Sequence, residues 1–114
     1  MTAPPACAGY LAELTSRRLS AHTLAATARD LTALCAFCVE RRAMIPEHID
    51  THLLRAWLAA LRGRGLSPAS VRRMLCSARG WLRFEAQCNR LPNNPAQGLR
   101  APKGRRELPK SVDA

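Results

Sequence analysis

Two cysteines and two histidines have the spacing that first suggests chemistry in this chain. Cys35-x-x-Cys38 is followed by His48-x-x-x-His52, so two thiolates and two imidazoles could form a tetrahedral zinc site. In zinc fingers, however, the two cysteines lie on a β-hairpin, and about twelve residues separate the cysteine pair from the histidine pair. Here the gap is nine residues, and both cysteines fall on the apolar stripe of a predicted helix. We therefore predict buried core thiols, with no metal and no other cofactor.

A second pair, His52 and Arg55, forms a His-x-x-Arg sequence of the kind expected in phosphoryl-transfer chemistry. No tyrosine follows it, because the single tyrosine, Tyr10, lies in the first predicted helix. The chain also has no Gly-rich phosphate loop, no Ser-His-Asp order and no paired carboxylates in a plausible site. We therefore predict surface or capping roles for His52 and Arg55, and no catalytic residue.

The strongest signal is a helix start that occurs twice. Leu19-Ser20-Ala21-His22-Thr23 and Leu66-Ser67-Pro68-Ala69-Ser70 share the pattern Leu-Ser-x-x-[Thr/Ser]. The first follows Arg17-Arg18, and the second follows Arg62-Gly63-Arg64-Gly65. A serine at this position predicts an N-cap, because its hydroxyl can accept a hydrogen bond from a first-turn amide. The free amides of a helix start favour phosphate, and a major groove admits a helix. Ordinary capping would explain either copy by itself.

The charge of the chain favours the nucleic-acid interpretation. The 114 residues carry a net charge of +10, which implies a polyanionic partner such as nucleic acid or an anionic membrane. No apolar run approaches the roughly 20 residues of a membrane span, and the N-terminus lacks signal-peptide order, so we expect a cytosolic protein. From residue 51 to 84 there is no acidic residue, but there are seven arginines: Arg55, Arg62, Arg64, Arg72, Arg73, Arg79 and Arg83. A solvated face of an arginine-rich protein is the alternative explanation.

The sequence predicts that these side chains lie on helices, because Ala, Leu and Arg dominate and apolar residues recur at intervals of three and four. We predict a first helix over about 7–16 and a second from Ser20 to about Arg41, broken by 44–46. Asp50 caps a third helix that ends at Gly63 and Gly65. Ser67 caps the fourth, with Pro68 at its first position. Arg72, Cys76, Arg79 and Arg83 form a stripe on this helix, apart from its apolar face.

Composition divides the chain into one domain, 1–90, and a basic linker or tail, 91–114. Prolines 92, 95, 102 and 109 are too closely spaced for a helix. The five cysteines are odd in number and three have helical spacing, which favours reduced, buried thiols over disulfides.

Several motifs in order resemble the N-terminal core-binding domain of tyrosine recombinases, of the Xer and phage integrase type. They are Leu19-Ser20-x-His22-Thr23-Leu24, Arg29-Asp30-Leu31, Arg64-Gly65-Leu66-Ser67-Pro68-x-Ser70-Val71-x-Arg73-x-Leu75-x-x-x-Arg79-x-Trp81-x-x-Phe84 and Asn94-Pro95-Ala96-x-Gly98-Leu99-Arg100-x-Pro102-Lys103. The resemblance covers about residues 10–110. It departs from the family at Thr27, where an aromatic residue is common.

The resemblance implies an all-α, four-helix SAM-like bundle that forms one half of a clamp around a recombination site in double-stranded DNA. The second and fourth helices would face the major groove, with most contacts to phosphates and two or three to base edges. The DNA-facing candidates, carried over by position, are Ser20, His22, Thr23, Thr27, Ser67, Ser70, Arg72, Arg73, Cys76, Ser77 and Arg79.

The resemblance also implies what the chain lacks. The family's catalytic domain would begin near 108–110, so we expect a piece of a longer recombinase, joined to that domain by the linker 98–110 and unable by itself to cut DNA. The parent would assemble as a tetramer, with the first helix a plausible contact. Two alternatives remain: a helical protein-interaction module whose charge only provides solubility, and a zinc-dependent regulator, which depends on metal content.

Overall fold

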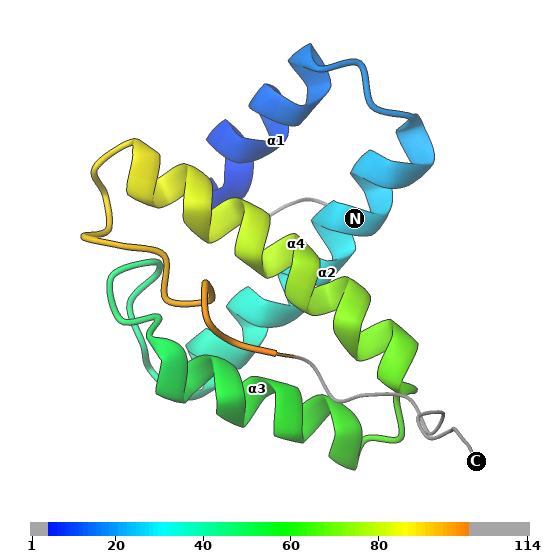
Figure 1. Ribbon diagram of the computed structural model, residues 1–114, viewed down its shortest axis with the longest axis vertical. Helices are drawn as coiled ribbons and strands as arrows, with labels where there is room; N and C mark the ends of the chain where they lie inside the picture. Colours follow the sequence, from blue (N-terminus) through cyan, green and yellow to red (C-terminus); the bar gives the residue numbers. More distant parts are fainter. Residues whose placement is uncertain (1–4, 101–114) are drawn as a thin grey trace.

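The computed structural model describes residues 5–100, which form four α-helices and no strand. A short turn of 3-10 helix, η1 (Pro5–Cys7), leads into α1 (Ala8–Ser16), followed by α2 (Ala21–Glu40), α3 (Thr51–Gly63) and α4 (Pro68–Gln87). The helices α2 and α4 cross at the centre, with α1 and α3 at the two ends of the molecule (Figure 1). The predicted all-α fold is confirmed, and each helix begins and ends close to its predicted limits. None of the described helices is long and apolar enough to cross a bilayer.

Local capping sets these helix limits. Ser20, Asp50 and Ser67 are the N-caps of α2, α3 and α4, as predicted, and each side chain accepts a hydrogen bond from the amide three residues later. Beyond the C-cap, each helix has a residue in the left-handed region, which is Gly65 after α3, with φ 91°. This conformation lets the Gly65 and Leu66 amides donate to the Arg62 and Leu61 carbonyls and close α3.

The core forms where the apolar stripes meet. The pair α2 and α4 makes the most extensive helix contact, and α3 packs mainly on α4. The apolar residues at intervals of three and four on α3 and α4 are buried: Leu53, Leu54, Trp57, Leu58 and Leu61 on α3, and Val71, Met74, Leu75, Ala78, Trp81 and Leu82 on α4. On α2, Leu31, Leu34 and Cys38 are buried, whereas Leu24, Ala28 and Phe37 are half-buried.

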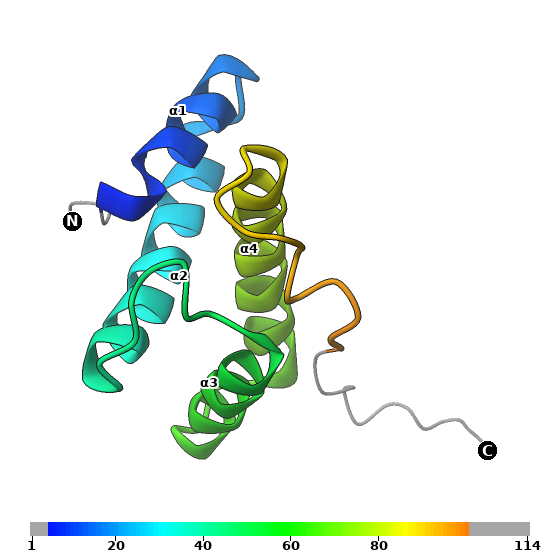
Figure 2. The same cartoon turned by 90° about the vertical axis from the view of Figure 1, so that its left-hand side faces the viewer.

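The packed domain extends past the boundary that composition predicts after residue 90. Leu91, Ala96 and Leu99 are buried in the core, at 7%, 0% and 5% exposure. In Figures 1 and 2 this segment, drawn orange, lies along α4 and passes towards α3. The prolines do exclude a helix here, but apolar side chains between them pack on the bundle. The described part of the predicted linker is therefore part of the domain, and 101–114 lies outside the described residues.

Candidate nucleic-acid interface

The two repeated sequence motifs have the same local structure. Ser20 has φ −64° and ψ 154°, and Ser67 has φ −70° and ψ 157°. The Thr23 amide donates to the Ser20 hydroxyl, and the Ser70 amide to the Ser67 hydroxyl, both at 3.1 Å. Each serine hydroxyl in turn donates to the hydroxyl three residues on, at 2.9 and 3.1 Å. The repetition in sequence is thus a repeated capping geometry, which leaves other first-turn amides for solvent or an anion.

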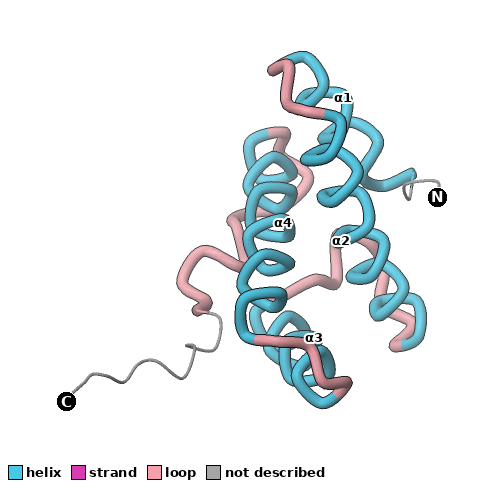
Figure 3. Tube along the Cα trace, turned by 90° about the vertical axis from the view of Figure 1, so that its right-hand side faces the viewer, coloured by secondary structure: helices cyan, strands magenta, loops and turns pink. Residues whose placement is uncertain are grey.

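Tertiary packing brings these two starts to one side of the molecule. Both α2 and α4 begin at the right in Figure 1, and Figure 3 views the molecule from that side, with the loops before α2 and α4 towards the reader. Arg17 and Arg18 precede one start and Arg62 and Arg64 precede the other, and all four are exposed. The result is one face with two helix starts and four exposed arginines, of which Arg17 is paired with Glu13.

An ion pair between a buried carboxylate and a half-exposed guanidinium joins α2 to α4. Asp30 is 2% exposed and accepts hydrogen bonds from Arg73 Nη2 at 2.8 Å, Arg73 Nε at 3.3 Å and the Ser77 hydroxyl at 2.8 Å. The Arg73 side chain is 57% exposed, so the guanidinium is held by two N–H groups and shows the others to solvent. The hydrogen bond to Asp30 raises the pKa of Arg73. Asp30 therefore fixes the orientation of a surface cation.

Arg79 has a different partner. Its Nε donates to the Ala96 carbonyl at 3.3 Å, and its Nη2 donates to the Leu99 carbonyl. Asn94 donates back to the Arg79 carbonyl at 3.3 Å, and its side-chain oxygen accepts from the Ala96 amide at 2.9 Å. At the other side, the Thr51 hydroxyl donates to the Pro95 carbonyl at 2.7 Å. These bonds hold the segment 94–99 against α3 and α4. Arg79 therefore anchors the backbone of this segment.

The eleven predicted DNA-facing residues thus divide into three groups. His22, Thr23, Arg72 and Cys76 are exposed on α2 and α4, while Thr27 is half-buried. Ser20, Ser67 and Ser70 take part in capping. Arg73, Ser77 and Arg79 make structural bonds within the domain. The sequence analysis did not predict the structural role of Asp30. The motif Arg29-Asp30-Leu31 offered a signal for it, because the acid directly precedes a leucine of the buried stripe.

The residues of the possible zinc set do not come together. Cys35 and Cys38 are buried in α2, while His48 and His52 are exposed, and the His48 Nδ1 accepts from the Met44 amide at 2.9 Å. Within residues 5–100, no group of three or more His, Cys, Asp or Glu is arranged to hold a metal ion.

Instead, Cys35 lies beside another buried thiol, Cys7. The interaction between the two thiols raises the pKa of Cys7, as does burial, and it lowers the pKa of Cys35. Cys76 and Cys88 are exposed.

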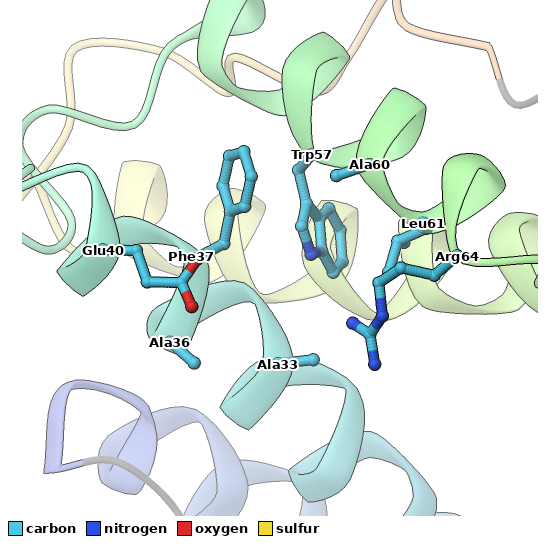
Figure 4. A pocket seen from close by; sticks show the side chains of 8 residues that line it. All are labelled: Ala33, Ala36, Phe37, Glu40, Trp57, Ala60, Leu61 and Arg64. Atoms are coloured by element: carbon cyan, nitrogen blue, oxygen red, sulfur yellow. The ribbon is translucent and has the colours of Figure 1, made fainter.

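A groove of about 500 Å³ lies between α2 and α3. The Phe37 and Trp57 rings lie side by side along it, and Glu40 and Arg64 are at its two ends (Figure 4). Three alanines, at 33, 36 and 60, complete an apolar lining. This is the one feature of the described residues that suits a protein partner better than a nucleic acid.

The all-α bundle agrees with the comparisons with known proteins. The family model of the phage integrase N-terminal SAM-like domain matches residues 8–87, and the chain belongs to this family. The curated proteins it resembles are tyrosine recombinases of the Xer type.

Three curated relatives, each a tyrosine recombinase XerC, support this assignment. The chain is 42% identical over 98 residues to the protein of Xylella fastidiosa, covering 86% of this chain and 33% of the relative. It is 39% identical over 106 residues to that of Xanthomonas campestris pv. campestris, covering 92% and 33%. It is 37% identical over 97 residues to that of Pseudomonas syringae pv. tomato, covering 85% and 32%. The chain thus spans about a third of their length, and no solved structure matches it.

Proposed function

We propose that this domain binds double-stranded DNA as the N-terminal half-clamp of a site-specific tyrosine recombinase. In this proposal α2 and α4 grip the recombination half-site, while a catalytic domain in the same parent chain performs strand breakage and rejoining. The role of the domain is positioning: arginines neutralise phosphates and release counterions, and the two helix starts set the register on the duplex. The tetramer of the parent is part of the same proposal.

The main support for the proposal is that α2 and α4 begin on the same side of the molecule. Either cap alone is ordinary, but α2 and α4 are packed as a pair and begin on one face (Figure 1). The arginines before each start add positive charge, and no acidic residue occurs between 51 and 84 to oppose it. A protein-interaction surface would have no need of this one-signed charge.

Two exposed cysteines on α4 and at its end provide a test with an internal control. Cys76 lies on the exposed stripe of α4 in the proposed DNA face, whereas Cys88 is the C-cap at the far end of the helix. Alkylation by N-ethylmaleimide would be followed by mass spectrometry of the two peptides, with and without a duplex of about 30 base pairs that carries the site. We expect the duplex to slow alkylation of Cys76 several-fold and to leave Cys88 unchanged. Equal rates at Cys76 with and without bound duplex would reject α4 as the DNA-facing helix.

The groove between α2 and α3 favours a second candidate function, a protein-interaction module. Its aromatic lining and its opposite end charges would accept an amphipathic helix. Binding to duplex DNA that weakens strongly as salt rises favours the half-clamp. No binding to duplex DNA even at low salt favours the protein-interaction module. The substitution Ala60→Gln fills the groove without a change in charge, and under the half-clamp proposal it leaves DNA affinity unchanged.

A further inference from the structure

Three arginines meet at a surface depression that none of the predicted DNA-facing residues lines. The depression has a volume of about 340 Å³ and is lined by Arg55, Leu58, Ala59 and Arg62 of α3 and by Leu99 and Arg100. We call it the α3 arginine pocket. Leu58 and Leu99 are buried, at 6% and 5% exposure, and form its apolar floor, whereas the three arginines are exposed around it.

The charges of this pocket are uncompensated. Among residues 5–100, no carboxylate lines it. Among the described residues, the side chains of Arg55 and Arg100 make no hydrogen bond or ion pair, and Arg62 donates a single bond, from Nη1 to the Leu66 carbonyl at 3.2 Å. Three like charges around one depression repel each other, and an apolar floor weakens solvent screening of that repulsion. An anion in the pocket would remove this cost.

The single bond of Arg62 connects the pocket to the proposed DNA face. Leu66 directly precedes Ser67, the N-cap of α4, so the guanidinium of Arg62 lies beside the start of that helix. A duplex seated at the α4 start would therefore extend its backbone towards the α3 arginine pocket. Guanidinium groups suit phosphate, because their planar N–H groups can bind two of its oxygens at once.

We infer that the α3 arginine pocket binds a backbone phosphate of the duplex, so that the interface extends from α2 and α4 onto α3 and the segment 96–100. This inference rests on the proposed function. Because Arg100 is near the end of the described chain, a phosphate bound between Arg55, Arg62 and Arg100 would also fasten the packed segment onto α3.

The test compares two charge-matched double variants. Arg55→Gln with Arg62→Gln alters the pocket, and Arg41→Gln with Arg42→Gln makes the same charge change at the C-terminal end of α2, far from Ser20. Fluorescence anisotropy with the duplex across a salt series gives the slope of log K against log salt, which changes by about 0.9 for each phosphate contact. We expect the pocket variant to reduce the slope by about 0.9, the value for one phosphate contact, and the control by less than half of that. Circular dichroism checks that both variants fold.

Two further arms separate the possible outcomes. Adding Arg100→Gln to the pocket variant should change the slope little further, because the three side chains share one phosphate. Equal slopes for the pocket variant and the control, with wild-type binding intact, overturn the inference but leave the half-clamp standing. No duplex binding by the wild type overturns the half-clamp itself. NMR shifts of the Arg55 and Arg100 Nε–H signals with inorganic phosphate, but not with duplex, would assign the pocket to a free phosphate and reject the duplex backbone.

Discussion

Loss of Arg73 from its ion pair with Asp30 should destabilise the domain much more than loss of Asp30. Asp30 and Arg73 are separated by 43 positions in sequence, and their side chains are 3% and 57% exposed. Arg73→Met leaves the Asp30 carboxylate buried, with the Ser77 hydroxyl as its remaining donor. Breaking a buried pair in this way typically costs about 3–5 kcal/mol, because a charge remains uncompensated.

The reverse substitution should be milder. Asp30→Ala removes the acceptor of three hydrogen bonds, but the half-exposed Arg73 can turn into water. We expect a loss of about 1–3 kcal/mol in the free energy of unfolding, from the charge-assisted bonds and the small cavity. Replacing both residues, as Asp30→Leu with Arg73→Met, should recover much of the loss, since apolar pairs often substitute well for buried ion pairs.

Urea unfolding, followed by the fluorescence of Trp57 and Trp81 and by circular dichroism, measures all three values. The matched control is Arg17→Met, which breaks the exposed pair with Glu13 at 3.1 Å and should cost less than about 0.5 kcal/mol. Two results would contradict this asymmetry: equal destabilisation by Asp30→Ala and Arg73→Met, or a double variant that is less stable than both single variants. Either result would mean that desolvation of Asp30 does not dominate.

Three further predictions concern packing, capping and the thiols. A methyl group at Gly80 on α4 would collide with the Tyr10 hydroxyl of α1, so Gly80→Ala should lower the melting temperature. In a Tyr10→Phe background only the contact with the ring carbon Cζ at 3.3 Å remains, and alanine favours helix by about 1 kcal/mol, so the same change should lower the melting temperature less. An equal loss in both backgrounds would contradict this steric origin. Ser67→Ala should cost about 1 kcal/mol in urea unfolding, whereas Ser67→Asp should largely retain the cap; similar losses for both would argue against capping. Burial raises the pKa of Cys38 from 9.0 to about 11, so the unfolded state releases this proton first, and the free energy of unfolding should fall as the pH rises from 9 towards 11. The variant Cys38→Ala, compared with wild type by urea unfolding at several pH values, should show a smaller fall, and an unchanged fall would refute the assignment.

The sequence alone determined the helices and their limits. Caps and period are local signals: Ser20, Asp50 and Ser67 bond to amides three residues away, and Gly65 closes the helix that precedes it. Apolar spacing identified the buried face of α3 and α4 for the same reason, since side chains three and four positions apart share one side of a helix. The repeated helix start and the arginine-rich stretch followed from counting residues.

Only the tertiary structure decided which polar groups are available at the surface. Arg73 and Arg79 look alike in sequence, yet one is held by Asp30 and the other by the carbonyls of Ala96 and Leu99. The burial of Leu91, Ala96 and Leu99 likewise comes from packing that composition does not show. These partners are 17 to 43 positions apart, so their meeting depends on how α2, α3 and α4 cross. Composition and period do not encode that crossing, because it is set by the packing of side chains from separate helices.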